Sequence, residues 1–372
     1  MFGSRDRMRV PEPRRKRGKF MRVMLWLSLL LLIAAGAAFY GKQQYEAEGP
    51  LATEQVFTVE RGMNARAVAK MLAAQGIIRS ADIFTVAAYV TRDFRRIKAG
   101  EYLAPAGASM AMLMDIIVQG KEYTFRLTIP EGWTSQMAVE RINANNALGG
   151  SAVEVPAEGT LLPDTHTFRR GFDRQQLIDN MTKAQKDLIA ELWPKRAADL
   201  PIQTPQEAII LASIVEKETS VPAERPQVAA VFINRLRLGM RLQSDPTVIY
   251  GIVAGKGRLD RTISKADLRQ ETPYNTYRIK GLPPGPIANP GRDSIAAVLN
   301  PAVTEDLYFV ADGTGGHAFS KTLDDHNANV KEWRALEKRL AEEAEESEES
   351  EEADEPLTKP VIPLPVPRPA KL

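Results

Sequence analysis

Two acidic side chains at the end of an apolar segment are the residues in this chain best suited to chemistry. Glu216 and Glu218 lie in the segment Ala212-Ser-Ile-Val-Glu-Lys-Glu-Thr219. A carboxyl group held against apolar surface loses hydration of its charged form, so its pKa rises and it can donate a proton near neutral pH. Protonation of a leaving oxygen is what cleavage of a glycosidic bond requires.

A helix must hold these carboxyl groups, and its start is marked by Thr204 and Pro205. Threonine caps helix N-termini, and proline suits the first helical position because its missing N–H has no partner there. Apolar side chains then surround nearly the whole predicted helix, so we expect it at the centre of its domain. At roughly 100° per residue both glutamates fall beside apolar side chains, and the helical wheel favours Glu218 over Glu216 only slightly.

Polar and aromatic side chains suited to sugar binding follow this helix. Amides and hydroxyls can bond sugar hydroxyl and acetamido groups, and aromatic faces suit pyranose rings. The candidates lie in a further helix, a polar segment and a loop: Asn234, Gln243, Ser244, Asp245, Thr247, Tyr250, Tyr274, Asn275 and Tyr277. For each tyrosine, packing in the core with a satisfied hydroxyl is an equally weighted alternative.

The composition argues against several other chemistries. The chain has no cysteine, which excludes disulfides and thiolate metal sites. Its three histidines, His166, His317 and His326, show no ligand spacing. His317 is more typical of a hairpin surface than of a residue that supports a site. The run 313–316 lacks the Lys-Ser/Thr ending of a phosphate loop, and no Gly-x-Ser-x-Gly element is present. We expect no metal, no organic cofactor and no nucleic-acid partner.

The N-terminal region contains an apolar run, residues 23–40, that is long enough to cross a bilayer. Basic residues precede it, and the positive-inside rule keeps them in the cytoplasm: Arg14, Arg15, Lys16, Arg17, Lys19 and Arg22. A cleaved signal peptide is the alternative, because Ala35-Gly36-Ala37 resembles a cleavage site. The length of the apolar run and of the basic lead favours an uncleaved single-span anchor.

The rest of the chain divides by composition, and we expect an α+β fold. Residues 1–22 form a cytoplasmic basic segment, 41–53 a polar linker, 54–122 a small α+β subdomain and 123–335 a larger α+β domain. The net charge of +2 conceals an acidic run at 342–355, and a proline-rich run follows it. Like charges repel and cannot bury a core, so we expect residues 336–372 to be a disordered, solvated tail rather than a docking segment.

Several motifs resemble those of the endolytic murein transglycosylases, the YceG-like or MltG family. Gly281-Leu-Pro-Pro-Gly-Pro-Ile-Ala-Asn-Pro-Gly291 is similar to the family's GLPPGPI-x-NPG almost letter for letter. Glu158-Gly-Thr-Leu-Leu-Pro-Asp-Thr165 resembles its EG-x-L-x-PDTY element, with His166 where an aromatic residue is commoner. The segments 212–219, 231–235 and 241–250 resemble its signature, and the resemblance covers roughly residues 54–335.

The resemblance implies that the second glutamate, Glu218, is the catalytic acid. The pair Glu218-Thr219 also resembles the Glu-Ser that carries the acid in soluble lytic transglycosylases and goose-type lysozymes. The resemblance further implies that residues 123–335 are the catalytic domain and that residues 54–122 are a LysM-like subdomain. For that subdomain, glycan binding and a role as a packing spacer carry equal weight.

By resemblance, the protein is a single-pass inner-membrane enzyme whose catalytic domain faces the periplasm. It would cleave the MurNAc-GlcNAc bond within nascent peptidoglycan strands, leave 1,6-anhydro-MurNAc ends and so limit strand elongation. Peptidoglycan synthases of the elongation or division machinery would be its partners. Two alternatives remain: a muramidase that uses Glu218 to hydrolyse the same bond with water, and a non-enzymatic scaffold that binds peptidoglycan and recruits synthases.

Overall fold

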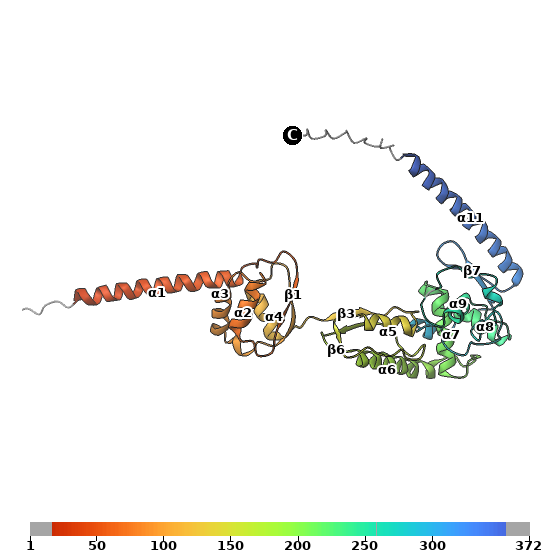
Figure 1. Cartoon of the computed structure of the whole chain (residues 1–372), viewed down its shortest axis with the longest axis horizontal. Coiled ribbons are helices and arrows are strands. Elements are labelled where there is room, and N and C mark those ends of the chain that lie inside the picture. Colours follow the sequence, from red (N-terminus) through yellow and green to blue (C-terminus); the bar gives the residue numbers. More distant parts are fainter. Residues whose placement is uncertain (1–16, 258, 355–372) are drawn as a thin grey trace, which may run out of the picture. The chain divides into compact units, whose positions relative to one another are not determined.

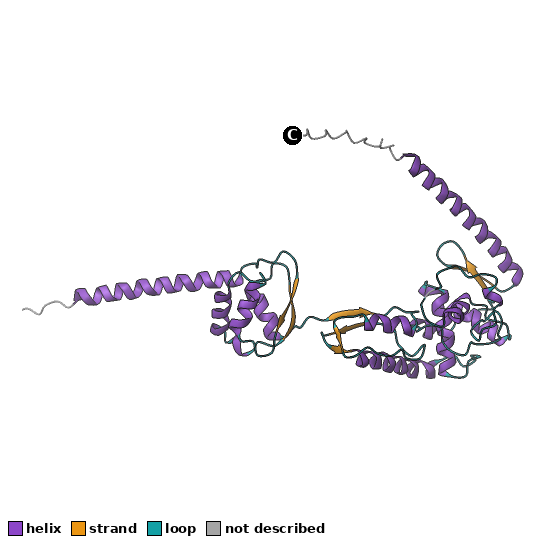
Figure 2. Cartoon of the chain, viewed as in Figure 1, coloured by secondary structure: helices purple, strands orange, loops and turns teal. Residues whose placement is uncertain are grey.

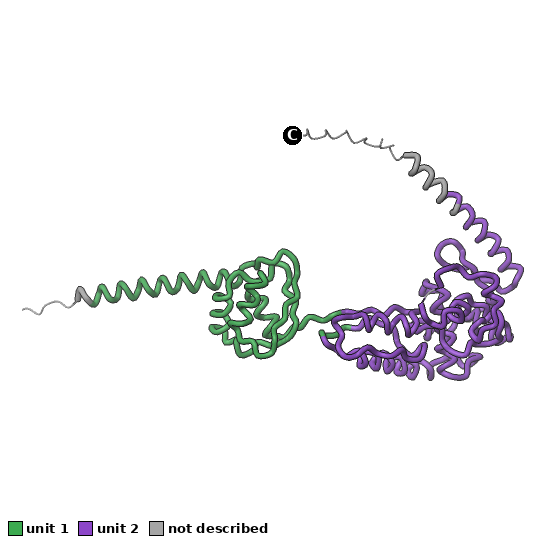
Figure 3. Tube along the Cα trace, in the orientation of Figure 1, with its two compact units in different colours: residues 1–125, 167–170 green, residues 126–166, 171–372 purple. Residues whose placement is uncertain are grey.

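The chain folds into two compact units in this computed structural model, which describes residues 17–257 and 259–354. Unit 1 comprises the described residues up to Phe125 together with Thr167–Arg170, and unit 2 comprises Arg126–His166 and the described residues from Gly171 onward (Figure 3). Helices and strands are mixed in both (Figure 2), which agrees with the expected α+β class. Residues 1–16 of the basic segment and 355–372 of the tail lie outside the described residues.

Unit 1 begins with the long helix α1 (Arg17–Glu46), which contains the whole apolar run. Within the described residues, one helix is long and apolar enough to cross a membrane, at Phe20–Glu46 with a mean hydropathy of 2.2. The helix does not end at Tyr40, so the first part of the expected linker is helical. Lysine, glutamine and glutamate favour helix, and Lys42 lies 3.9 Å from Glu46 one turn later.

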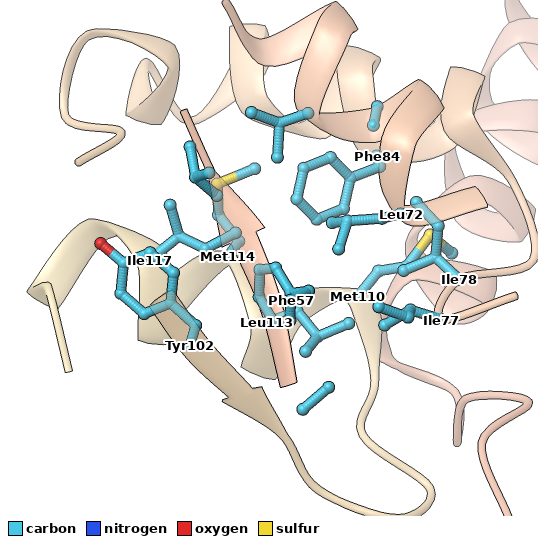
Figure 4. Packing of buried hydrophobic residues seen from close by; sticks show 14 of the residues in the cluster. Phe57, Leu72, Ile77, Ile78, Phe84, Tyr102, Met110, Leu113, Met114 and Ile117 are labelled. Carbon is cyan, nitrogen blue, oxygen red and sulfur yellow. The ribbon is translucent and has the colours of Figure 1, made fainter. Parts of the chain in front are cut away.

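The remainder of unit 1 is a two-stranded sheet packed against three short helices. Strand β1 (Gln55–Val59) pairs antiparallel with β2 (Gly100–Ala104). Helices α2 (Ala65–Ala74), α3 (Ala81–Val90) and α4 (Met110–Gln119) are each capped by an Asn or Ser side chain, and a 3-10 turn, η1 (Asp93–Arg95), follows α3. Their apolar faces meet in one core, in which the largest buried side chains include Phe57, Leu72, Phe84, Tyr102 and Leu113 (Figure 4).

The strands of unit 2 are short, and β3 and β5 connect the two units. Strand β3 (Phe125–Thr128) pairs with β5 (Thr165–Phe168), and β4 (Leu148–Gly149) pairs in parallel with β6 (Phe172–Asp173). Strands β7 (Tyr308–Ala311) and β8 (His317–Ser320) form an antiparallel hairpin. The helices therefore supply most of the core of this unit.

Helix α7 (Pro205–Glu218) lies at the centre of unit 2, as its apolar sequence predicted. Thr204 caps it in a capping box with Glu207, and Pro205 opens it. Helices α8 (Arg225–Arg237), α9 (Asp245–Val253) and α10 (Arg292–Leu299) pack against it. The unit also contains α5 (Ser135–Asn143), α6 (Arg174–Leu192) and the short turns η2 (Trp193–Lys195), η3 (Pro222–Glu224) and η4 (Asp267–Arg269). Helix α9 is an element that we did not predict, because its first residues looked like a polar loop.

The last helix, α11 (Leu323–Asp354), differs from the expected tail. It continues through the acidic run that we expected to be disordered from residue 336 onward. Alanine, glutamate, leucine and lysine are strong helix formers, and Lys338 lies 3.3 Å from Glu342 one turn later. We expected disorder because this segment cannot bury an apolar core. Its residues nevertheless form a helix because their local helix propensity is high.

We predict that unit 2 depends on the burial of α7. Ile214 has no exposed surface, whereas Leu238 is 63% exposed after the end of α8. Replacing Ile214 by Ala should cost about 2–5 kcal/mol, because buried apolar contacts are lost and a cavity remains. Leu238→Ala should change stability by about 0.5 kcal/mol or less. Urea unfolding followed by tryptophan fluorescence checks this, and equal losses in the two variants would contradict it.

Candidate functional site

The candidate site is built around the carboxyl group of Glu218, the last residue of α7. The side chain is half-buried, and its Oε1 accepts a short hydrogen bond from the Ser244 hydroxyl. Ser244 is buried and is the N-cap residue of α9, so a second helix fixes the donor in place. The site therefore joins the C-terminus of one helix to the N-terminus of another.

Burial controls the protonation of this carboxyl group. Loss of hydration raises the pKa of Glu218 from 4.5 to about 7, and the charge of Asp245 adds to the rise. The hydrogen bond from Ser244 and the positive charges of His317 and Arg235 lower the pKa and partly offset the rise. A carboxyl group in this state is partly protonated at neutral pH and can both give and take a proton.

Glu216, the other candidate for the acid on the helical wheel, has different surroundings. Its side chain is 4% exposed and lies 3.2 Å from the guanidinium of Arg225, which also contacts Glu131 and Asp293. Its second oxygen accepts a hydrogen bond of 2.8 Å from the backbone N–H of Gly291. Glu216 thus belongs to an ion-pair network, in which an arginine and a backbone amide donate to both of its oxygens.

Four of the predicted sugar-binding residues lie together near Glu218. Ser244 bonds it directly, and Asp245 is the next residue along the chain. The Tyr277 hydroxyl donates to Asp245 Oδ1 at 2.7 Å. Thr247 is buried one turn into α9, where its hydroxyl lies 2.8 Å from that of Thr276 and donates to the backbone oxygen of Ser244. Thr247 therefore supports Ser244 rather than lining open space.

Two predicted binding residues have amide groups that serve the framework instead. The Asn234 side chain donates to the backbone oxygens of Thr304 and Asp306, at 2.9 and 3.1 Å. The fully buried Asn275 side chain donates to the backbone oxygen of Gln270 at 2.6 Å. These amides connect loops to the core because buried carbonyl groups need donors, and the prediction that they contact sugar stays a prediction.

The remaining candidates have other surroundings. Gln243 is exposed, and its φ of 54° places it in the left-handed region. The rings of Tyr250 and Tyr274 are 4.8 Å apart, and the Tyr250 hydroxyl donates to Glu158 Oε2 at 3.3 Å. Burial raises the pKa of Glu158 as well, although hydrogen bonds from Ser135 oppose the rise. The tyrosines thus belong to a second polar cluster.

Four residues outside the predicted set also surround the site. His317, expected on a hairpin surface, has a side chain only 17% exposed, and its Nδ1 lies 2.7 Å from Glu224 Oε2. The same oxygen of Glu224 accepts from the Thr219 hydroxyl at 3.1 Å. Arg235 is buried and donates to the backbone oxygens of Leu307 and Leu242, at 2.6 and 2.7 Å.

Unit 2 also has a cavity of about 410 Å³. Its walls include Trp133 and Thr134 before α5, Lys217 of α7, and Pro246 and Tyr250 of α9. It combines aromatic and cationic side chains next to the helices that carry Glu218 and Ser244. Among the residues that the structure describes, no group of three or more His, Asp or Glu side chains is arranged to hold a metal ion.

Comparisons with known proteins agree with the motifs. The model of the YceG-like family matches residues 57–332. The endolytic murein transglycosylase of Bacillus subtilis is 30% identical over 332 residues, which cover 80% of this chain and 89% of that protein. The endolytic murein transglycosylase of Streptococcus pneumoniae is 26% identical, and the match covers 83% of this chain and 64% of that protein.

A solved structure is also similar. The crystal structure of a putative YceG-like protein from Listeria monocytogenes has 28% sequence identity and a TM-score of 0.47. The match covers 74% of this chain and 98% of that chain.

The raised pKa of Glu218 predicts a dependence of stability on pH. Because the fold disfavours the ionised form, stability falls as pH rises from 4.5 to about 7 and is unaffected by this group outside that range. Glu218→Gln removes this fall. The unfolding free energy of the variant, relative to that of the native chain, should therefore be higher at about pH 8 than at about pH 4, by up to about 3 kcal/mol. Unfolding free energies from urea titrations at the two pH values measure this gain.

Glu216→Gln is the matched control for that titration. It removes one charge from the pair with Arg225 and leaves that buried guanidinium less well compensated. We expect it to lower stability at pH 8 rather than raise it. A stabilising effect of Glu216→Gln, or none from Glu218→Gln, would contradict the assignment of the neutral carboxyl to Glu218.

Proposed function

Because this chain belongs to the YceG-like family, we propose that it is an endolytic peptidoglycan lytic transglycosylase anchored in the membrane. Its relatives are named as murein transglycosylases, and the matches extend over both units. The observation that carries the proposal is the carboxyl group of Glu218, held by Ser244 at the end of a buried helix with a pKa of about 7.

In the proposed reaction a single carboxyl group acts first as a general acid and then as a general base. Protonated Glu218 donates its proton to the oxygen that bridges C1 of MurNAc and C4 of GlcNAc, and the C1–O bond breaks. The acetamido group of MurNAc stabilises the positive charge that develops at C1. Ionised Glu218 then accepts the proton of the MurNAc 6-hydroxyl as that oxygen attacks C1. The products are a 1,6-anhydro ring and a free GlcNAc 4-hydroxyl, and the carboxyl group regains its proton.

The neighbours of Glu218 have separate roles in this scheme. Ser244 orients the carboxyl group and stabilises its ionised form during the second half of the reaction. Asp245, held by Tyr277, keeps negative charge nearby and favours the protonated form at the start. We assign sugar contacts to Ser244, Asp245 and Tyr277, and framework roles to Thr247, Asn234 and Asn275.

Helix α1 is the basis of the proposed location. We propose that it is an uncleaved anchor in the inner membrane, with the basic residues before it in the cytoplasm and both units on the outer face. Glycan strands near their site of synthesis are then the accessible substrate, and peptidoglycan synthases are the expected partners. We retain a LysM-like, glycan-binding role for the folded part of unit 1 as part of this proposal.

The test is mass spectrometry of the products that the purified chain releases from uncrosslinked glycan strands. We expect fragments with anhydro ends, and their loss by at least about 100-fold in Glu218→Gln, because general acid catalysis contributes roughly that factor or more. Glu216→Gln is the control that retains the acid. Fragments with reducing ends would indicate a muramidase, and binding without cleavage would indicate a scaffold.

The pH dependence of kcat/KM gives a second prediction. The first step needs protonated Glu218, so kcat/KM should fall above about pH 7, following the pKa of the free enzyme. Ser244→Ala removes a hydrogen bond that lowers this pKa, and the descending limb should therefore move to higher pH. A limb that stays in place in the variant would show that another group controls it.

A further inference from the structure

Helix α3 of unit 1 has an apolar face that the unit itself does not cover. Its sequence, Ala-Asp-Ile-Phe-Thr-Val-Ala-Ala-Tyr-Val, is apolar nearly all round. One side, with Phe84 and Ala88, is in the core, while Val86, Tyr89 and Val90 on the other side are 61%, 53% and 77% exposed. A helix that is apolar all round is normally buried all round, so this face requires a partner.

The exposed face borders a cavity of about 570 Å³ between α3 and the last turns of α1. Its walls are mainly apolar and include Ala38, Gly41 and Tyr45 of α1 and Ile83, Val86 and Val90 of α3. Small side chains on α1 leave the space open, and no atom lies within 4 Å of the position that a Cβ on Gly41 would take. The shape and lining suit a flexible hydrocarbon chain rather than a sugar or peptide, which would need more polar partners.

The position of α1 in a bilayer determines how deep this groove lies in the membrane. The apolar run 23–40 rises roughly 27 Å at about 1.5 Å per residue, which is close to the ~30 Å hydrocarbon core of a bilayer. Ala38 therefore lies at the level of the acyl chains. Tyr45, about 10.5 Å beyond Ala38 along the helix, lies at the level of the headgroups. A groove lined by these residues of α1 thus opens into the outer leaflet.

The charged residues near the groove lie at the headgroup level, where charged side chains can stay hydrated. Lys42, Glu46 and Asp82 line its polar part beside Tyr45, at the headgroup level. Directly after α3 come Arg92, Arg95 and Arg96, of which Arg96 pairs with Asp93 at 3.1 Å. The segment 92–96 therefore has an excess of positive charge, which anionic lipid headgroups attract.

We propose that the groove between α1 and α3 binds an acyl chain of an outer-leaflet phospholipid, and that Val86, Tyr89 and Val90 lie in the membrane interface. The proposal rests on the membrane anchor proposed above and adds a second membrane contact to it. It makes unit 1 a peripheral membrane module, with one helix that spans the bilayer and a second that lies against its surface.

Because the chain has no cysteine, single-cysteine variants of the full chain can be labelled at one position each. We would place an environment-sensitive fluorophore at Val86→Cys or Val90→Cys in liposomes that contain anionic phospholipid and lipids with quenchers on the acyl chain. We expect blue-shifted emission and strong quenching at both positions. Val56→Cys is the control: it is 38% exposed on β1, which lies on the side of unit 1 away from α1 (Figure 1), and it should stay unquenched.

Leu30→Cys, in the middle of α1, separates failure of the groove from failure of the anchor. If Leu30 is quenched and Val86 and Val90 are not, lipid does not occupy the groove and the inference is overturned. Blue-shifted but unquenched probes at the groove would show burial against a second copy of the chain, which also overturns it. An unquenched Leu30 would refute the anchor itself and, with it, the proposal that rests on it.

A second variant tests occupancy directly. Gly41→Phe would place a ring in the open space of the groove. Native mass spectrometry of the full chain released from anionic liposomes should show a retained phospholipid on the native chain and a several-fold loss of it in Gly41→Phe. Gly36→Phe, further back on α1 and not part of the groove wall, should retain the lipid. Equal retention in all three proteins would overturn the proposal.

Discussion

A carboxyl group at the end of a buried helix needs a donor for its oxygen, and Ser244 supplies one to Glu218. Most of unit 2 is arranged around this contact. Helices α8 and α10 bury α7, so its last side chain emerges among apolar neighbours. Helix α9 brings Ser244 at its N-terminus, and the buried hydroxyls of Thr247 and Thr276 hold that end in place. The pKa of the acid thus depends on the packing of several helices.

The surroundings of the neighbouring glutamate show how the fold distinguishes two similar side chains. Glu216 lies two residues earlier on the same helix, yet it is paired with Arg225 and with the N–H of Gly291. Gly291 ends the proline-rich segment 281–291, and a Cβ there would require the carboxylate of Glu131 to move. The rigid segment that marks the family in sequence therefore supplies a hydrogen bond to one glutamate, while burial raises the pKa of the other.

Local patterns in the sequence predicted the local parts of this structure. The cap at Thr204 and the apolar sequence of α7 predicted the helix and placed two glutamates at its end, but they left the choice between Glu216 and Glu218 open. The contact of His317 with Glu224 joins residues 93 positions apart, and no local pattern signals it. Asn234 and Asn275 looked like ligand-binding amides because an amide that binds sugar and one that binds a backbone carbonyl are identical in sequence. Only the fold decides which carbonyl groups need them.

The unbroken helix α1 has a mechanical consequence. Because the same hydrogen-bonded cylinder runs from the apolar span into the packing of unit 1, no swivel separates the two. A tilt or axial rotation of the span is therefore transmitted as torque to unit 1. A flexible linker in place of the helix would not transmit this motion. In the proposed anchored state, a membrane helix that packs against α1 would therefore change the orientation of unit 1.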